Sequence, residues 1–247
     1  MTYCLAIKVD EGLVFGSDTR TSAAVDDVRV YNKSHVFEFP GERVLVMLSA
    51  GNLATTQSLV QRLHQDAAGG APLNLRNAHN LFAAAEYVGA TSVNLARASA
   101  QLSQSTADFR VALILGGQIS GQEPEIYMIY PEGNCISSSP ETPFLQIGET
   151  KYGKPILDRA IRPHLSLNDA ARCAMVSLDA TIKSNLSVGP PLDLAFLPRN
   201  TLKLTHLRLE VDTPYYRTAT EAWNQAQIAA LRALPKFPWE TQGGAKA

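Results

Sequence analysis

The chain has 247 residues, of which 45% are hydrophobic and 18% are charged, with a net charge of −1. This length suits one large domain or two smaller ones, and it is enough to bury roughly 70–75% of the unfolded chain's surface. A chain with so little net charge and so many apolar residues is not intrinsically disordered. The 22 Lys and Arg are matched by 23 Asp and Glu, so no basic excess is left to neutralise the phosphates of a nucleic acid.

The three cysteines, Cys4, Cys135 and Cys173, are odd in number and far apart in the sequence. Neither a disulfide framework nor a Cys-x-x-Cys metal site fits this spacing, so we expect reduced and mostly buried thiols. The sequence has no run of 18 consecutive apolar residues, and its N-terminal apolar stretch is too short for a signal peptide. These patterns predict a soluble cytoplasmic protein with no membrane partner.

Strands are predicted over the first fifty residues, with turns at Asp10-Glu11-Gly12 and Pro40-Gly41-Glu42. A polar loop follows the second of these strands. The apolar period then changes from two residues to three or four, which predicts a helix after Gly51-Asn52 and a long second helix from Asn77 to about Gln101. The four strands expected here are Tyr3–Val9, Leu13–Ser17, Val36–Phe39 and Arg43–Ala50.

The second half of the chain repeats this order of strands followed by a pair of helices. The first helix is expected at Tyr152–Ile161 and the second at Asn168–Ser184, with Asn168 or Ser166 as its N-cap. An amphipathic helix is expected after Pro214, ending near Leu234. The strands expected here are Phe109–Leu115, Glu125–Tyr130, Phe144–Ile147, Leu192–Leu197 and Leu202–Leu209.

This order predicts an α+β fold in one domain, residues 1–247, with a core over about 2–210 and a C-terminal helical extension over about 213–240. Two sheets with a helix pair outside each would bury every apolar face as a four-layer αββα sandwich. The pattern alone does not choose the strand topology.

Thr2 directly follows the initiator Met1 and directly precedes a strand that reads as buried. If Met1 is removed, the hydroxyl of Thr2 is a nucleophile and its own α-amine is a base within the same residue. The amine suits this role because its ordinary pKa is about 7.7–8.0. Threonine at position 2 is also common by chance, so this feature alone does not establish a catalytic role.

Two charged residues qualify as partners for Thr2. The first hairpin returns the chain to Thr2 at Gly16-Ser17-Asp18-Thr19-Arg20, and Lys33 precedes a later strand. A buried Lys33 next to the amine would lower the pKa of that amine, and Asp18 would keep the lysine charged and oriented. The alternatives are a turn residue for Asp18 and a solvated loop charge for Lys33.

Together these residues resemble the proteasome β-subunit family of N-terminal-nucleophile hydrolases, and most closely its bacterial branch Anbu, the ancestral β-subunit. The opening block, M-T-Y-C-x-A-I-K-x-D-E-G-L-V-F, carries the resemblance, which covers about residues 2–210. Ile147–Leu157 and Ser184–Leu194 also look like that branch. The resemblance implies an αββα sandwich of this hydrolase type.

The resemblance implies a threonine peptidase with Thr2 as nucleophile, Asp18 as its acidic partner and Lys33 as the activating lysine, without a metal or organic cofactor. Gly51 matches the family's oxyanion glycine, whose N–H stabilises developing negative charge, although a plain strand-to-helix turn also explains it. Two departures stand out: Glu149 replaces the family's supporting Ser, and Asn185-Leu186-Ser187 replaces its Asp-x-x-Ser pattern, with Asp179 earlier in the chain.

Cys4 is two residues from Thr2 and so is expected on the same strand face, but a strand cysteine is more often buried packing than a nucleophile. Two other functions stay open: a non-catalytic assembly subunit, which retention of Met1 would favour, and an amidohydrolase acting on a small amide. Peptides or unfolded proteins are the expected substrates. The low charged fraction and the apolar stripe of the helix over Tyr216–Leu234 predict a homo-oligomer, either a ring or an open helical lock-washer. The sequence does not show whether an ATPase partner exists.

Overall fold

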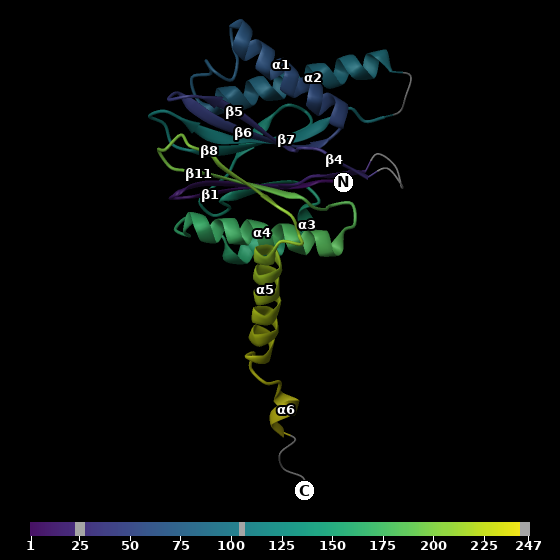
Figure 1. Ribbon diagram of the computed structural model, residues 1–247, viewed down its shortest axis with the longest axis vertical. Coiled ribbons are helices and arrows are strands. Elements are labelled where there is room, and N and C mark those ends of the chain that lie inside the picture. Colours follow the sequence, from purple (N-terminus) through teal and green to yellow (C-terminus); the bar gives the residue numbers. More distant parts are fainter. Residues whose placement is uncertain (23–27, 104–106, 243–247) are drawn as a thin grey trace. The chain divides into compact units, whose positions relative to one another are not determined.

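A computed structural model describes residues 1–22, 28–103 and 107–242. The chain divides into two compact units, Met1–Glu210 and Val211–Ala247. Within the first unit, two five-stranded sheets lie face to face, with one pair of helices outside each sheet (Figure 1). This arrangement confirms the α+β sandwich predicted from the sequence.

The first sheet begins with the hairpin of β1 (Tyr3–Val9) and β2 (Gly12–Asp18). Its strand order is β10-β1-β2-β11-β12, and each neighbouring pair is antiparallel. The register sets Cys4 opposite Ser17, so the hairpin returns the chain to its own start. The other strands are β10 (Phe144–Gly148), β11 (Leu192–Pro198) and β12 (Thr205–Leu209).

The second sheet has the order β5-β6-β7-β8-β9, and all of its pairs are antiparallel. Its hairpin between β5 and β6 turns at the predicted Pro40-Gly41-Glu42. A separate short ribbon pairs β3 (Arg20–Ser22) with β4 (Val28–Val30). The strands of the second sheet are β5 (Ser34–Phe39), β6 (Arg43–Gly51), β7 (Val111–Ile119), β8 (Glu125–Ile129) and β9 (Cys135–Ser137).

The helices α1 (Leu53–Gly69) and α2 (Leu81–Leu102) cover the second sheet, whereas α3 (Thr150–Ala160) and α4 (Leu167–Ser184) cover the first (Figure 1). Three of the four helices begin at a side chain that accepts a hydrogen bond from the first turn, which satisfies an otherwise free amide. These N-caps are Asn52, Asn80 and Ser166.

Apolar side chains fill the space between the two sheets and the space between the second sheet and its helices. Phe15 and Val46 belong to the layer between the sheets, and Leu59 and Val88 belong to the outer layer. The sheets approach closely at Gly116, where the Cβ of an alanine would lie 2.6 Å from the ring of Phe15. A glycine is therefore needed at this point of the interface.

Some boundaries differ from the sequence prediction. The second helix begins at Leu81 rather than Asn77, because the side chain of Asn77 accepts a hydrogen bond from Asn74 N in a preceding turn. Ser166, and not Asn168, is the N-cap of α4. The last strand of the first sheet begins at Thr205 rather than Leu202, whose positive φ of 48° is incompatible with a strand.

Four short elements were not predicted: β3, β4, β9 and a five-residue helix near the C-terminus. Each has five residues or fewer, so it is too short to show a period of apolar residues. Part of the polar loop predicted after Ser17, residues 23–27, lies outside the described residues.

The second unit contains α5 (Pro214–Arg232) and α6 (Pro238–Gln242). Thr213 caps α5, and Pro214 occupies the first helical position, where the missing N–H costs nothing. The predicted C-terminal helix therefore ends at Arg232, two residues before Leu234. The expectation of a single domain with an extension stays a prediction. Across the described ranges, no helix combines the length and apolarity needed to cross a membrane.

Candidate active site

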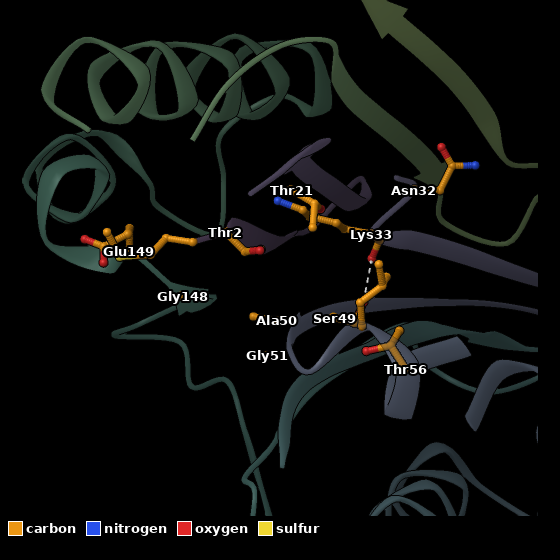
Figure 2. Close-up of a pocket in the computed structure, with 12 residues that line it drawn as sticks. Thr2, Thr21, Asn32, Lys33, Ser49, Ala50, Gly51, Thr56, Gly148 and Glu149 are labelled. Carbon is orange, nitrogen blue, oxygen red and sulfur yellow. Dashed lines mark hydrogen bonds between the residues drawn. The ribbon is translucent and has the colours of Figure 1, made fainter. Parts of the chain in front are cut away.

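A cavity of about 370 Å³ opens where β1, β6, β10 and α1 begin or end. It brings together residues that are far apart in the sequence: Thr2, Lys33, Gly51 and Glu149 all line it. Figure 2 shows Thr2 between Glu149 on one side and Lys33 with Thr21 on the other. Three of the four predicted site residues, Thr2, Lys33 and Gly51, therefore line the cavity, and the fourth, Asp18, accepts a hydrogen bond from Lys33.

Thr2 directly precedes β1 and is hydrogen-bonded to the residue that follows the neighbouring strand β10. Its carbonyl oxygen accepts a hydrogen bond from Glu149 N at 2.8 Å. Met1 also lines the cavity and is 59% exposed.

Asp18 is fully buried at the end of β2 and accepts three hydrogen bonds. Its Oδ1 accepts from Tyr3 N at 3.0 Å and from Lys33 Nζ at 2.7 Å, and its Oδ2 accepts from Gly189 N at 3.1 Å. Burial raises the pKa of Asp18, whereas Lys33 and the two amides act in the opposite direction. The hairpin thus ties Asp18 to the residue after Thr2, as its geometry predicted.

Lys33 connects the acid to the cavity. It directly precedes β5, is only 5% exposed, and donates to the carbonyl oxygen of Arg20 at 2.5 Å as well as to Asp18. An ammonium has three N–H groups, so one donor of Lys33 remains after these two bonds, on a residue that lines the cavity with Thr2. Lys33 is therefore a buried cation with a fixed partner, not a solvated loop charge.

Gly51 ends β6 at the cavity with a φ of 120°, a conformation that favours glycine. Ser49 N donates to Lys33 O, on the β5 side of the strand, and amides two residues apart on a strand point the same way. The N–H of Gly51 therefore faces the β5 side too, past the last β5–β6 pair of Ser34 with Leu48. The N-terminus of α1 follows at Leu53, and its dipole places positive potential at the same wall.

The sequence did not identify the polar side chains that complete the cavity. These include Ser49, whose hydroxyl lies 3.5 Å from Lys33 O (Figure 2), and Thr56, which donates to Asn52 O at 3.0 Å. Gly189, whose amide holds Asp18, was also missed. It lies 171 residues from Asp18 in the sequence, and nothing in its neighbourhood marks that contact.

The two departures from the family pattern, at Glu149 and at the Asn185-Leu186-Ser187 stretch, lie in different parts of the fold. Glu149 lines the cavity and directly precedes α3. Asp179 is buried on α4 and pairs with Lys183 Nζ at 2.8 Å. In the loop that follows, the side chain of Asn185 accepts from Ser187 N. Neither Asp179 nor the loop that contains Asn185 and Ser187 is among the described residues that line the cavity.

Cys4 lies in the layer between the sheets and has no exposed surface. Burial raises the pKa of its thiol, so the nucleophilic thiolate is disfavoured. In the ranges that the structure covers, no group of three or more His, Cys, Asp or Glu residues is arranged to hold a metal ion.

Comparison with known proteins agrees with this geometry. A family profile described as "Proteasome subunit" matches residues 2–196. The chain belongs to the proteasome subunit family. A curated relative, proteasome subunit beta 2 of Pyrobaculum calidifontis, is 24% identical over 208 residues, covering 84% of this chain and 94% of the relative.

Solved structures place this proteasome subunit in the Anbu branch. Anbu from Yersinia bercovieri is 40% identical with a TM-score of 0.90, covering 96% of this chain and 99% of the other. The helical assembly of the Anbu complex from Pseudomonas aeruginosa is 43% identical with a TM-score of 0.90, covering 96% and 98%. Anbu from Hyphomicrobium sp. strain MC1 is 42% identical with a TM-score of 0.86, covering 96% and 99%. The fold is thus the N-terminal-nucleophile type of proteasome subunits.

Proposed function

We propose that this proteasome-type hydrolase is a threonine peptidase whose nucleophile is the hydroxyl of Thr2, exposed when Met1 is removed. The observation that carries the proposal is the shared cavity of Thr2 and Lys33, with Lys33 fixed at 2.7 Å from the buried Asp18. A nucleophile, a positioned cation and a buried acid are the parts that such a reaction needs. The first step is the loss of Met1, which its 59% exposure permits.

Peptide cleavage then proceeds through an acyl-enzyme. The α-amine of Thr2 takes the proton of its hydroxyl, the oxygen attacks the substrate carbonyl carbon, and the carbonyl π electrons move to the oxygen. The N–H of Gly51 and the N-terminus of α1 stabilise this oxyanion. The intermediate then collapses, the ammonium of Thr2 gives its proton to the leaving amine, and water hydrolyses the ester. Lys33 lowers the pKa of the hydroxyl, and Asp18 keeps Lys33 charged.

Labelling with an electrophilic peptide probe tests this assignment. We expect the protein to form a covalent adduct on Thr2, and Thr2→Ala to abolish the adduct. Thr2→Ser is the matched control, because it keeps a hydroxyl and an α-amine at the same position. An adduct that persists in Thr2→Ala would overturn the assignment. An absence of labelling together with retained Met1 would favour the alternative, a non-catalytic assembly subunit.

We propose peptides or unfolded protein segments as substrates, and a homo-oligomer as the working form in the cytoplasm. The helical assembly of the Pseudomonas aeruginosa Anbu complex supports an open helical arrangement over a closed ring. Apolar side chains of the second unit are available for such contacts: Leu231, Leu234 and Trp239 are 63–68% exposed. An extension beginning at Thr213 would then form a subunit interface.

Truncation tests this assembly. A chain that ends before Thr213 should lose the oligomer and sediment as a monomer at a concentration at which the intact chain is assembled. Lys236→Ala, a polar change in the same segment, should leave the assembly intact. An intact chain that sediments as a monomer at micromolar concentration would overturn the oligomer, and a truncated chain that still assembles would remove the extension from the interface.

A further inference from the structure

The peptide bond between Thr2 and Tyr3 is the covalent link that holds Thr2 to the fold once Met1 is removed. This bond is trans, and a trans peptide is planar from one Cα atom to the next, so its plane carries the Cα of Thr2. Both polar groups of the plane are bonded: the carbonyl oxygen accepts from Glu149 N at 2.8 Å, and the N–H donates to Asp18 Oδ1 at 3.0 Å. The place of Thr2 in the cavity therefore depends on how firmly Tyr3 is held.

The side chain of Tyr3 lies on the helix side of the first sheet. Successive residues of a strand point to opposite faces, and Cys4 faces the second sheet. Tyr3 therefore points toward α3 and α4, and it has no exposed surface. Its hydroxyl lies 2.7 Å from Ser177 Oγ on α4 and accepts a hydrogen bond from Gln146 Nε2 on β10. The side chain thus connects the start of β1 to two other elements.

The Tyr3 hydroxyl uses its polar atoms in these contacts. Burial raises the pKa of Tyr3, so the hydroxyl keeps its proton. Because Gln146 donates to the hydroxyl oxygen, that proton is available for Ser177. Gly153 on α3 leaves the space for this contact, since the Cβ of an alanine there would overlap both hydroxyl oxygens and lie 2.8 Å from Tyr3 Cζ. A phenylalanine ring would fill the same volume, so the hydroxyl serves to orient a side chain that packing alone already buries.

We propose that Tyr3 is a positioning residue, whose hydroxyl, bonded to α4 and β10, holds the Thr2–Tyr3 peptide and so fixes the position of the Thr2 hydroxyl in the cavity. This inference rests on the proposed function of Thr2. Tyr3 acts through the backbone and not through contact with substrate, because its ring lies on the helix side of the sheet.

Loss of the Tyr3 hydroxyl should slow the covalent step and leave substrate binding unchanged. The other residues that line the cavity stay in place, but Thr2 is less well aligned with the bound carbonyl carbon. A misplacement of about 1 Å can cost about 10²-fold in rate, and for a loosened residue we expect a smaller loss of about tenfold. A role confined to stability would lower the melting temperature and leave the rate of the folded protein unchanged.

Labelling by an electrophilic peptide probe at several probe concentrations separates the maximal rate of adduct formation from the probe concentration that gives half of it. Tyr3→Phe should lower the maximal rate about tenfold and leave the half-maximal concentration unchanged. Ser177→Ala removes the partner on α4 and should act in the same direction. The double variant should label no more slowly than Tyr3→Phe alone, because the two changes remove one shared contact.

Tyr87→Phe is the matched control. It removes a hydroxyl that donates to Asp66 Oδ2 at 2.6 Å, in the helix layer over the second sheet, and it should leave both labelling constants unchanged even where it lowers the melting temperature. A normal maximal rate in folded Tyr3→Phe would overturn the proposal, and so would an equal loss of rate in Tyr87→Phe.

Two further results are decisive. If Tyr3→Phe does not fold, the maximal rate of Ser177→Ala decides in the same way. If the intact chain forms no adduct, the proposed function of Thr2 fails and the positioning role fails with it, whereas an intact chain and variants that all label at one rate remove the positioning role alone.

Discussion

On one side of Thr2, Asp18 accepts hydrogen bonds from Tyr3 N, Gly189 N and Lys33 Nζ, whereas on the other side Glu149 has a charged neighbour at 3.8 Å. Both are carboxylates beside the same cavity, and the first is fully buried. The difference lies in how completely each charge is compensated. The negative charge of Asp18 is compensated within the folded protein by three hydrogen-bond donors. The charge of Glu149 has only the exposed Lys151 as a neighbour.

The largest effect should come from removing the compensated acid. Asp18→Asn leaves the ammonium of Lys33 buried without its counter-charge, and breaking a buried pair in this way costs about 3–5 kcal/mol of unfolding free energy. Probe labelling of Thr2 should also fall to background, because Lys33 loses its orientation. Urea denaturation measures the stability, and Glu149→Gln is the comparison, with an expected loss below about 1 kcal/mol.

Lys33→Ala removes the cation of the same pair, and we expect it to abolish nearly all labelling of Thr2. If Lys33→Ala labels Thr2 at the normal rate, Asp18 and Lys33 form a structural pair only, and the contrast between the two sides of the cavity has no catalytic meaning.

A smaller loss is expected at the oxyanion wall. The Cβ of an alanine at position 51 would lie 2.6 Å from Arg110 O, and the backbone there has a φ of 120°. Gly51→Ala should therefore destabilise the fold by about 1–3 kcal/mol and shift the N–H that faces the cavity. Thermal denaturation and labelling rate measure the two effects. Gly41→Ala, at a positive φ but with open space around it, separates backbone strain from steric overlap.

His35, a partly buried histidine on β5, should make the stability of the fold depend on pH. Burial, with His64 nearby, lowers the pKa of His35 to about 4. The unfolded chain, with a histidine pKa of about 6.5, binds this proton first, so stability is lost as pH falls from about 6.5 to about 4. His35→Gln should reduce this loss by about 2 kcal/mol, whereas the exposed His79→Gln should not. An equal pH dependence in both variants would contradict the assignment to His35.

The smallest effect on labelling is expected for Cys4→Ser. The thiol is buried between the sheets and donates at most a weak hydrogen bond, 3.7 Å long, to Ser49 O. The hydroxyl can use the same acceptor, so labelling of Thr2 should persist at near the normal rate while stability falls by about 1 kcal/mol. A loss of the adduct in a folded Cys4→Ser protein would show that the assignment of the nucleophile to Thr2 is wrong.

The sequence predicted the parts of the fold that show a long apolar period. The strand Tyr3–Val9 was predicted with its observed bounds, and most other strands and helices agree within a few residues. The elements that were missed, such as β9, are too short for a period, and the start of α2 depended on the side-chain turn at Asn74. Local chemistry of this kind is not visible in apolar patterning.

For the site, the first hairpin was informative because its register alone returns Asp18 to Tyr3. Lys33 could be singled out only together with the family pattern. The amide of Gly189 and the hydroxyls of Ser49 and Thr56 could not be predicted, because their positions depend on how distant strands and helices pack. The charge of Glu149 was visible in the sequence, but its weak compensation was not.

The role of Thr2 as an N-terminal nucleophile can be tested by the intact mass of the protein purified from its own cells, together with tandem mass spectrometry of the probe adduct. We expect a mass lower by one methionine residue than that of the full sequence, and an adduct carried by an N-terminal Thr2. A protein that keeps Met1 and carries no adduct on Thr2, or one whose adduct lies on another residue, would contradict this role.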